Sequence, residues 1–211
     1  MLASDDEKFH RLRERMVEQQ IARRGIQEKR VLHAMRTVPR HLFVAENLRL
    51  SAYDDNPLPI GEDQTISQPY IVALMTELLE IEPDDTVLEI GTGCGYQAAV
   101  LAQMAKEVYS VEIKERLFIH AKETLEALGY STVRLRQGDG SQGWPGHGPY
   151  DKIILTAAPA KIPSCLGEQL KEGGKLVAPV GSYVQELRVL TKTAIGIEER
   201  RSIPVRFVPL I

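Results

Sequence analysis

The chain has 211 residues, of which 43% are hydrophobic and 26% charged, and its formal net charge is −3. This length and balance fit one globular domain with a full core. The slightly acidic charge argues against a protein built to bind a nucleic-acid backbone, and no apolar run approaches the roughly 20 residues of a membrane span. The polar start lacks the apolar stretch of a signal peptide, so we expect a cytoplasmic protein, and a monomer.

Residues 1–80 predict an N-terminal helical extension. Apolar residues recur at helical spacing in two segments that Gly25 separates. They are Leu12, Met16 and Ile21 in the first segment and Val31, Leu32 and Met35 in the second. Pro39 is expected to start a third short helix through residues 41–43, because proline is tolerated in a first helical turn. A turn-rich connector then leads to an apolar helix over residues 70–79.

From residue 86 onward strands and helices alternate, which predicts a parallel sheet with helices on both faces. The expected fold class is α/β, with a doubly wound, mainly parallel sheet of seven strands. The predicted strands are 86–90, 107–112, 132–136, 151–156, 175–179, 186–191 and 205–208, and the predicted helices between them are 96–105 and 114–128. We therefore divide the compact chain into the extension, residues 1–80, and an α/β core, residues 81–211.

Residues 87–97 carry the most informative motif, an apolar strand that contains Glu89 and leads into three alternating glycines. These glycines are Gly91, Gly93 and Gly95. Tyr96 stands where a dinucleotide fingerprint needs its last glycine. The spacing is typical of loops that hold S-adenosylmethionine, whose ammonium group an acid such as Glu89 can meet. On this motif alone, a dinucleotide site and a turn that only reverses the chain remain open.

Two further loops follow the next two predicted strands. Glu112 ends the second strand, where an acid can accept hydrogen bonds from both hydroxyls of a ribose, although NAD would fit equally and a solvated acid is the simpler alternative. Asp139 and Gly140 follow the third strand, at the position where class I methyltransferases, which this order of motifs resembles, hold adenine. An ordinary Asp-Gly turn is the alternative. Because ligands of open α/β sheets bind at the carboxyl edge, we expect the three loops to form one site for S-adenosylmethionine.

The sequence offers no pattern for a metal or for an activated serine. None of the five histidines pairs with another at metal-ligand spacing, and Cys94 and Cys165 form neither a disulfide framework nor a metal pattern. No Gly-x-Ser-x-Gly elbow is found in the sequence. We therefore expect no metal.

Over residues 16–210 the chain resembles the protein-L-isoaspartate (D-aspartate) O-methyltransferase family. Methyltransferases in general share the glycine loop, whereas segments 38–44 and 65–69 are typical of this family. The runs that carry the resemblance are 38–44, 53–54, 57–61, 64–69, 87–99, 128–130, 138–140, 143–145, 149–151, 156–159 and 205–210. Glu62 and Asp63 stand where the family usually has a residue followed by glycine, which we expect to alter backbone freedom beside the site. Cys94 stands where serine is common and should keep the fold of the loop.

The resemblance implies transfer of a methyl group from S-adenosylmethionine to the free carboxylate of L-isoaspartyl or D-aspartyl residues, with S-adenosylhomocysteine as product. The expected partners are damaged proteins and peptides that contain such residues. Since this carboxylate is already ionised at neutral pH, the enzyme needs no general base and has mainly to position its substrates. The implied cofactor-binding residues are Thr65, Ile66, Glu89, Gly91, Thr92, Gly93, Gly95, Glu112, Asp139 and Gly140.

The resemblance also makes Ser67 the candidate catalytic residue, whose hydroxyl would donate to the substrate carboxylate. From the residues alone, a cap for the helix over 70–79 is the favoured role of Ser67, and the resemblance reverses this order. Thr65 and Ile66 either cover the cofactor or only form the turn. Arg206, on the last predicted strand, either attracts the substrate by its charge or is an exposed arginine without such a role.

Three other functions compete with this hypothesis. A methyltransferase of another substrate, such as RNA, DNA or a small molecule, would share the glycine loop. Residues 156–159 read Thr-Ala-Ala-Pro, which differs from the motif with which adenine-N6 enzymes hold the flipped base. The chain also has no Pro-Cys pair, the nucleophile motif of cytosine-C5 enzymes. A nicotinamide oxidoreductase is disfavoured by Tyr96. A non-catalytic adaptor that recognises isoaspartate would keep the loop but could lose Ser67.

Overall fold

The computed structural model describes residues 2–211, with side chains from residue 6 onward. α1 (Leu2–Met16) continues through a π-helical turn (Val17–Ile21) and a 3₁₀ turn (Ala22–Arg24). Gly25 then ends the helix with φ +100°, a left-handed conformation that glycine adopts without strain. α2 (Lys29–Thr37) follows. The predicted pair of helical segments separated by Gly25 is confirmed.

Short elements connect α2 to the main sheet. They are the 3₁₀ turns Arg40–Phe43 and Glu46–Ser51, the strands β1 (Leu58–Gly61) and β2 (Gln64–Ile66), and the helix α3 (Pro69–Leu79). The third short helix expected after Pro39 is thus a 3₁₀ turn. The β1–β2 hairpin was not predicted, because strands this short, with prolines beside and within them, show no readable alternation. α3 begins at Pro69, one residue before the predicted start.

The main sheet confirms the predicted mainly parallel sheet of seven strands. Its order is β5-β4-β3-β6-β7-β8-β9, with parallel pairing from β5 to β7 and antiparallel pairing from β7 to β9. The strands are β3 (Thr86–Ile90), β4 (Glu107–Glu112), β5 (Val133–Gln137), β6 (Tyr150–Leu155), β7 (Leu170–Val180), β8 (Gln185–Thr193) and β9 (Gly196–Val205). β3 and β4 have the predicted bounds, whereas β7 and β8 extend beyond theirs.

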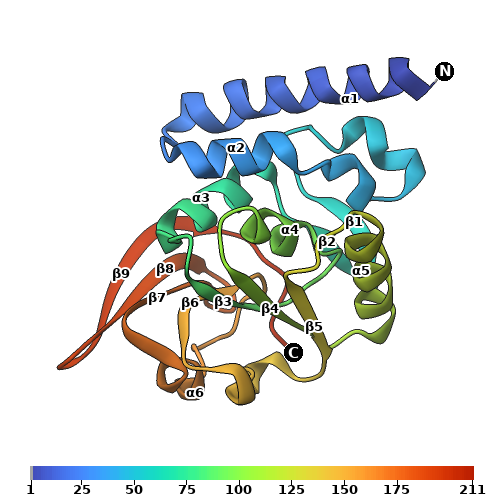
Figure 1. Cartoon of the computed structure of the whole chain (residues 1–211). Coiled ribbons are helices and arrows are strands. Elements are labelled where there is room, and N and C mark those ends of the chain that lie inside the picture. Colours follow the sequence, from blue (N-terminus) through green and yellow to red (C-terminus); the bar gives the residue numbers. More distant parts are fainter. Residues whose placement is uncertain (1) are drawn as a thin grey trace.

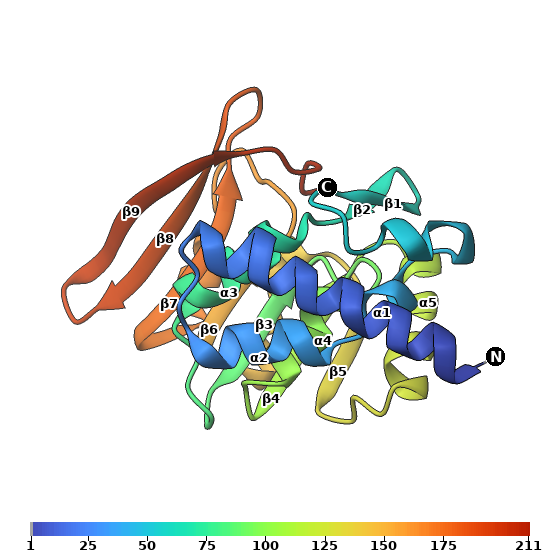
Figure 2. The ribbon, with the colours of Figure 1, turned by 90° about the horizontal axis from the view of Figure 1, so that it is seen from above.

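The predicted last strand over 205–208 is wrong. β9 instead begins at Gly196 and forms with β8 a long hairpin that projects from one end of the molecule (Figures 1 and 2). Residues 198–201 of β9 are two glutamates followed by two arginines, and they are exposed. A charged edge strand of this kind discourages pairing with other chains and has no apolar face for the sequence to show. Arg206 therefore follows the last strand and does not lie on it.

The helices cover the two faces of the sheet unequally (Figure 1). α3, α4 (Tyr96–Ala102) and α5 (Glu115–Ala127) pack on one face, α2 packs on α3 and α4, and α1 packs on α2. The other face carries α6 (Ser164–Glu168) and the 3₁₀ turns Gly140–Gln142 and Pro145–His147. α6 was not predicted, because five residues are too few to show a helical period. α4 ends three residues before the predicted end.

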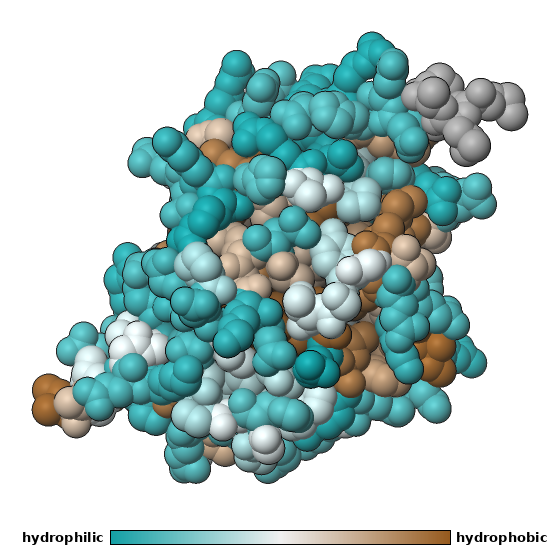
Figure 3. Space-filling model, in the orientation of Figure 1, coloured by the Kyte–Doolittle hydropathy of each residue, from teal (hydrophilic) through white to brown (hydrophobic). Residues whose placement is uncertain are grey.

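The surface reflects this layering. The outer side of the α1–α2 layer is mainly hydrophilic, whereas the tip of the β8–β9 hairpin shows hydrophobic surface (Figure 3). Ile195, in that tip, is 95% exposed. Across residues 2–211, no helix combines the length and the apolar character needed to cross a membrane.

One hydrophobic core joins the N-terminal extension to the sheet. The Tyr96 hydroxyl of α4 lies 3.8 Å from the Met35 sulfur of α2, and the Tyr96 ring meets the edge of Phe43 at 5.5 Å between centroids. Val87 and Ile154 from the strands belong to the same cluster. The division into residues 1–80 and 81–211 stays a prediction, although both parts contribute to this core.

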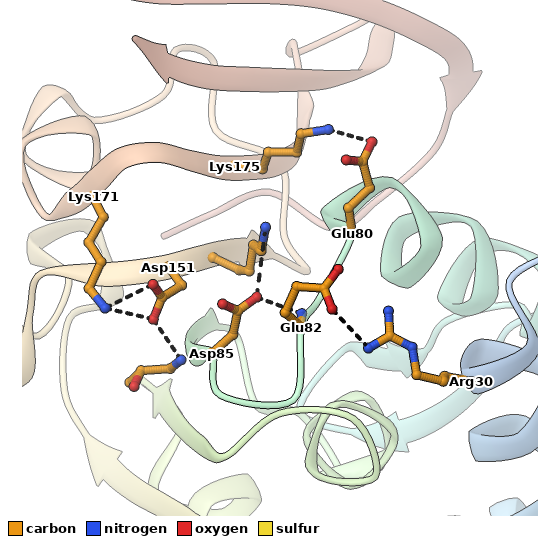
Figure 4. A network of polar contacts seen from close by, with 9 residues as sticks. Arg30, Glu80, Glu82, Asp85, Asp151, Lys171 and Lys175 are labelled. Atoms are coloured by element: carbon orange, nitrogen blue, oxygen red, sulfur yellow. Dashed lines mark hydrogen bonds and ion pairs between the residues drawn. The ribbon is translucent and has the colours of Figure 1, made fainter. Parts of the chain in front are cut away.

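Ion pairs hold the amino ends of the central strands together (Figure 4). The Asp151 carboxylate of β6 accepts hydrogen bonds from Lys171 Nζ at 2.8 Å and from the Thr86 amide of β3 at 2.9 Å. Burial opposes ionisation of Asp151, but these two donors outweigh it and hold its pKa below the usual value. Lys152 pairs with Asp85 at 3.7 Å beside them. The network fixes the edge of the sheet opposite to the one where ligands of such folds bind.

The turn between β1 and β2 places two non-glycine residues in the left-handed region, Glu62 at φ +51° and Asp63 at φ +57°. Two-residue turns of this type favour glycine in the second position, because other residues are strained there. We expect Asp63→Gly to raise the free energy of unfolding by about 0.5–1 kcal/mol, measured by urea denaturation. Glu62 is left in place because it pairs with Arg116 at 3.3 Å.

The matched control is Glu123→Gly, at an exposed position inside α5. Glycine in a helix interior should lower stability by about 1 kcal/mol, so the control separates the turn geometry from a general effect of glycine. A loss of stability in Asp63→Gly would contradict the strain argument.

Candidate active site

A cavity of about 790 Å³, counting the part open to solvent, lies at the carboxyl edge of the parallel strands. Its walls come from the segment after β1, from the ends of β3, β4 and β6, and from the C-terminal tail. The main lining stretches are 64–67, 90–94, 111–114, 156–157 and 208–211.

Most of the predicted site residues line this cavity. They are Thr65, Ile66, Ser67, Gly91, Thr92, Gly93, Glu112 and Gly140. Glu89, Gly95, Asp139 and Arg206 are not among the lining residues. The structure therefore brings together the hairpin segment, the glycine loop and the end of β4, as expected, and leaves four predicted residues behind or beside the cavity wall.

Hydrogen bonds at the end of β3 connect the loop after β3 to the ends of β4 and β6. The Gly91 amide donates to the Val111 carbonyl of β4 at 2.9 Å, and the Thr156 amide donates to the Ile90 carbonyl at 2.9 Å. The Thr156 hydroxyl also donates to the Gly91 carbonyl at 2.5 Å. The glycine loop is thus tied to the loops on both sides of it before any ligand is considered.

The glycines of the loop are required mainly by packing within the protein. A Cβ on Gly91 would lie 2.5 Å from Thr156 Oγ1, and one on Gly95 would lie 3.0 Å from Leu125 Cδ1 of α5. Both residues also have positive φ, +99° and +89°. Glycine is therefore needed at both positions whatever the ligand. This is the physical reason why the glycine pattern alone left more than one cofactor class open.

Glu89 lies beneath the loop and is fully buried. The Ser110 hydroxyl donates to its Oε2 at 2.5 Å, whereas its Oε1 has no hydrogen-bond partner. Burial raises the pKa of Glu89 to about 8; the Ser110 hydrogen bond opposes this and the nearby charge of Glu112 adds to it. Glu89 therefore does not reach the cavity surface, where the sequence predicted a direct contact with the ammonium group of a ligand.

Glu112 occupies the position that a ribose-binding acid requires. Glu112 is 5% exposed and lines the cavity. Oε2 accepts from the Gly93 amide at 2.8 Å and Oε1 from the Lys114 amide at 2.9 Å. Each oxygen keeps a further lone pair, so the two amides orient the carboxylate and still leave it able to accept hydroxyl groups.

In this structure Asp139 stabilises a turn, which is the simpler of its two predicted roles, and does not line the cavity. Its carboxylate accepts from the Ser141 amide at 2.8 Å and caps the 3₁₀ turn Gly140–Gln142. The side chain is exposed and does not line the cavity. Gly140 does line it, and a Cβ there would lie 2.5 Å from Ile90 Cγ2, so only glycine fits.

Ser67 lies in the segment between β2 and α3, where it is half-buried and lines the cavity. The N-cap of α3 is Gln68, and no side chain caps this helix. The alternative of a helix cap for Ser67 is therefore wrong. The Ser67 carbonyl accepts from Arg40 Nη2 at 2.7 Å.

The sequence profile of the protein-L-isoaspartate(D-aspartate) O-methyltransferase family matches residues 11–211. A protein-L-isoaspartate O-methyltransferase from Synechococcus sp. (strain JA-2-3B'a(2-13)) is 54% identical over 211 aligned residues, which cover 96% of this chain and 86% of that protein. The chain belongs to this family.

Two solved structures of the isoaspartate methyltransferase family share the fold. One, named protein-L-isoaspartate O-methyltransferase, is 31% identical with a TM-score of 0.86, and the match covers 93% of this chain and 65% of that one. The other, from Plasmodium falciparum in complex with S-adenosyl-L-homocysteine, is 26% identical with a TM-score of 0.83, covering 94% and 98%. The resemblance to the family and the α/β fold expected from the sequence are both confirmed.

In this member of the isoaspartate methyltransferase family, the C-terminal tail forms part of the cavity, which sequence analysis missed. The Ala158 amide donates to the Val208 carbonyl at 2.8 Å, and the Leu210 amide donates to the Ala158 carbonyl at 2.9 Å. These bonds hold Val208 to Ile211 against the loop after β6. The family-like run 205–210 was the available signal, but it was interpreted as an edge strand. Arg206, beside this tail, is exposed.

Buried Glu89 predicts a pH dependence of stability. Its pKa is raised to about 8 in the fold, against 4.5 for the free side chain, so the folded chain holds a proton that the unfolded chain loses between these values. Stability should therefore fall as pH rises through this window, by up to about 1.4 kcal/mol per pH unit. Glu89→Gln removes the titration, and we expect a flatter profile of unfolding free energy between pH 6 and 8.

The control is Glu123→Gln, an exposed carboxylate on α5, which should keep the wild-type slope. Equal slopes for wild type and Glu89→Gln would show that Glu89 is ionised in the folded chain at neutral pH.

Proposed function

We propose that this chain is a protein-repair methyltransferase that moves a methyl group from S-adenosylmethionine to the free carboxylate of L-isoaspartyl, and of D-aspartyl, residues in damaged proteins and peptides. Membership of the family supports this function, with 54% identity to a protein-L-isoaspartate O-methyltransferase over nearly the whole chain. The observation that carries it is the single cavity that joins Ser67 to the glycine loop and Glu112. Action as a monomer is part of the proposal.

The residues at the cavity fit the proposed cofactor. Glu112 offers two oriented carboxylate oxygens to a ribose diol, and Ile90, Ile113 and Gly140 give an apolar wall suited to a flat base. Thr65 and Ile66 of the hairpin segment and Thr92 of the loop complete the proposed set of contacts. When bound, S-adenosylmethionine supplies an electrophilic methyl group on a sulfonium centre. Within the side chains that the structure describes, residues 6–211, no cluster suited to a metal ion is found.

The cavity is built for positioning rather than proton transfer. Its lining holds one acidic side chain, Glu112, whose oxygens accept backbone amides, one lysine, Lys114, and no histidine. A substrate carboxylate is ionised at neutral pH and attacks as it is, so this chemistry requires no general base in the lining. Orientation of reacting groups can lower a barrier by roughly 7–11 kcal/mol in favourable cases.

Ser67 would supply the orienting contact. Its hydroxyl is not used to cap α3, and its position on the cavity wall is set by the carbonyl bond to Arg40. A hydroxyl that donates to one carboxylate oxygen leaves the other oxygen free to attack. Such a bond to an ionised group is among the stronger hydrogen bonds in proteins. The remaining predicted contacts are less direct: Glu89 would act from below the loop, Gly95 through loop shape, Asp139 from the rim and Arg206 through its charge.

We expect Ser67→Ala to lower kcat for an isoaspartyl peptide by about tenfold or more, because an orienting contact made in the transition state is lost. The measurement is methyl transfer from labelled cofactor at saturating peptide. Ser131→Ala, at an exposed turn, is the control and should keep wild-type kcat. A kcat within about twofold of wild type in Ser67→Ala would remove Ser67 from the proposed mechanism.

Three substrates decide the function itself. An isoaspartyl peptide, the same peptide with normal aspartate, and RNA are each incubated with the chain and labelled cofactor. We expect label only in the isoaspartyl peptide. Equal methylation of the normal peptide would overturn the repair function, label in RNA would indicate a nucleic-acid methyltransferase, and binding of the isoaspartyl peptide without transfer would indicate an adaptor.

A further inference from the structure

Arg40 is an arginine enclosed in the core. It opens the 3₁₀ turn Arg40–Phe43 and is 0% exposed. Among residues 6–211, no carboxylate lies within ion-pair distance of it. The titratable groups that act on its charge are Tyr53, Cys94 and Tyr96, none of which is a carboxylate. Charged side chains are almost never fully buried unless paired, since burial of an unpaired charge destabilises a fold by several kcal/mol.

The guanidinium group instead joins two backbone segments. Nε donates to the Ala52 carbonyl at 2.6 Å and Nη2 donates to the Ser67 carbonyl at 2.7 Å. The group also lies over the ring of Tyr96, 4.8 Å from its centroid. Tyr96 is the first residue of α4, directly after the glycine loop. Arg40 therefore contacts the segment that carries Ser67 and the end of the loop opposite to it.

The Ser67 segment has few other restraints. It lies between a three-residue strand and the start of α3, where no side chain caps the helix. The neighbouring Gln68 side chain donates to the Asp55 carbonyl at 3.0 Å, but that bond is exposed. The part-buried bond from Arg40 is the side-chain restraint on the Ser67 peptide group, and the orientation of that group sets the direction of the Ser67 side chain.

We propose that Arg40 is a positioning residue, which holds the Ser67 peptide group to the Ala52 segment so that the Ser67 hydroxyl points at the substrate carboxylate. The inference rests on the proposed function. A planar guanidinium suits this task, because its donors are fixed relative to one another and can serve two carbonyls at once, whereas a lysine ammonium is a flexible point charge. An apolar side chain of similar volume would fill the same space without the desolvation penalty, so packing alone does not account for arginine here.

The test compares Arg40→Met, Arg40→Lys, Ser67→Ala and the double variant Arg40→Met with Ser67→Ala. We expect Arg40→Met to lower kcat for an isoaspartyl peptide by about tenfold or more and Arg40→Lys to recover part of that loss, with cofactor affinity by calorimetry within about threefold of wild type. In the Ser67→Ala background, Arg40→Met should lower kcat by no more than about threefold further, because the residue acts through Ser67.

Arg36→Met is the control for loss of stability. It removes the 3.1 Å pair with Glu14 between α2 and α1 and leaves the cavity untouched. All variants are assayed well below their unfolding temperatures, where Arg36→Met should keep wild-type kcat. If Arg40→Met does not fold, Arg40→Lys carries the comparison alone and in combination with Ser67→Ala.

Two results would overturn the role of Arg40 without affecting the proposed function. One is a kcat within about twofold of wild type in both Arg40 variants, and the other is an equal loss from Arg40→Met with and without the Ser67 hydroxyl. A wild-type chain that does not methylate the isoaspartyl peptide would overturn the proposed function, and this inference with it.

Discussion

Strand β3 pairs in parallel with β4 on one side and β6 on the other up to its last residue, and the rest of the site depends on this double pairing. Parallel neighbours end at the same edge of a sheet, so the loops after β3, β4 and β6 must meet there. The bonds from the Gly91 amide to Val111 and from Thr156 to Ile90 extend that pairing into the loops. The cavity is therefore a consequence of the sheet, and its glycines are needed to pack the loops against one another as much as to admit a ligand.

Charged side chains are paired at the amino edge of the sheet and unpaired at its carboxyl edge. At the amino edge, Asp151 of β6 and Lys171 of β7 are paired at 2.8 Å, and this pair links the two strands. At the carboxyl edge, Glu89 and Arg40 are buried without an opposite charge in contact. Because burial raises the pKa of Glu89 to about 8, Glu89 is mainly neutral in the fold at neutral pH. The buried charge of Arg40 opposes folding, so a stable sheet and shared core are needed to tolerate it. Both groups lie behind the cavity wall, Glu89 beneath the glycine loop and Arg40 behind Ser67.

The parts predicted well are those with a local signal. The bounds of β3 and β4 were predicted to the residue, because each is a short apolar strand with clear stops. β9 was missed because an exposed, charged edge strand shows no apolar alternation, and α6 and the β1–β2 hairpin because they are too short to show a period. In the site, eight of the predicted residues line the cavity, and the C-terminal lining was missed because its role depends on docking against Ala158.

By itself the sequence determined the α/β order, the glycine loop, the acid at the end of β4 and the family, since hydrophobic period and motif spacing are properties of neighbouring residues. Only the tertiary structure decided that Ser67 faces the glycine loop, that Glu89 lies beneath the cavity wall, that Asp139 caps a turn beside it and that residues 208–211 close one side. Those facts depend on how segments far apart in the chain pack on one sheet. Such packing is determined by the burial and hydrogen bonding of the whole core, and hydrophobic period and motif spacing along the chain do not report it.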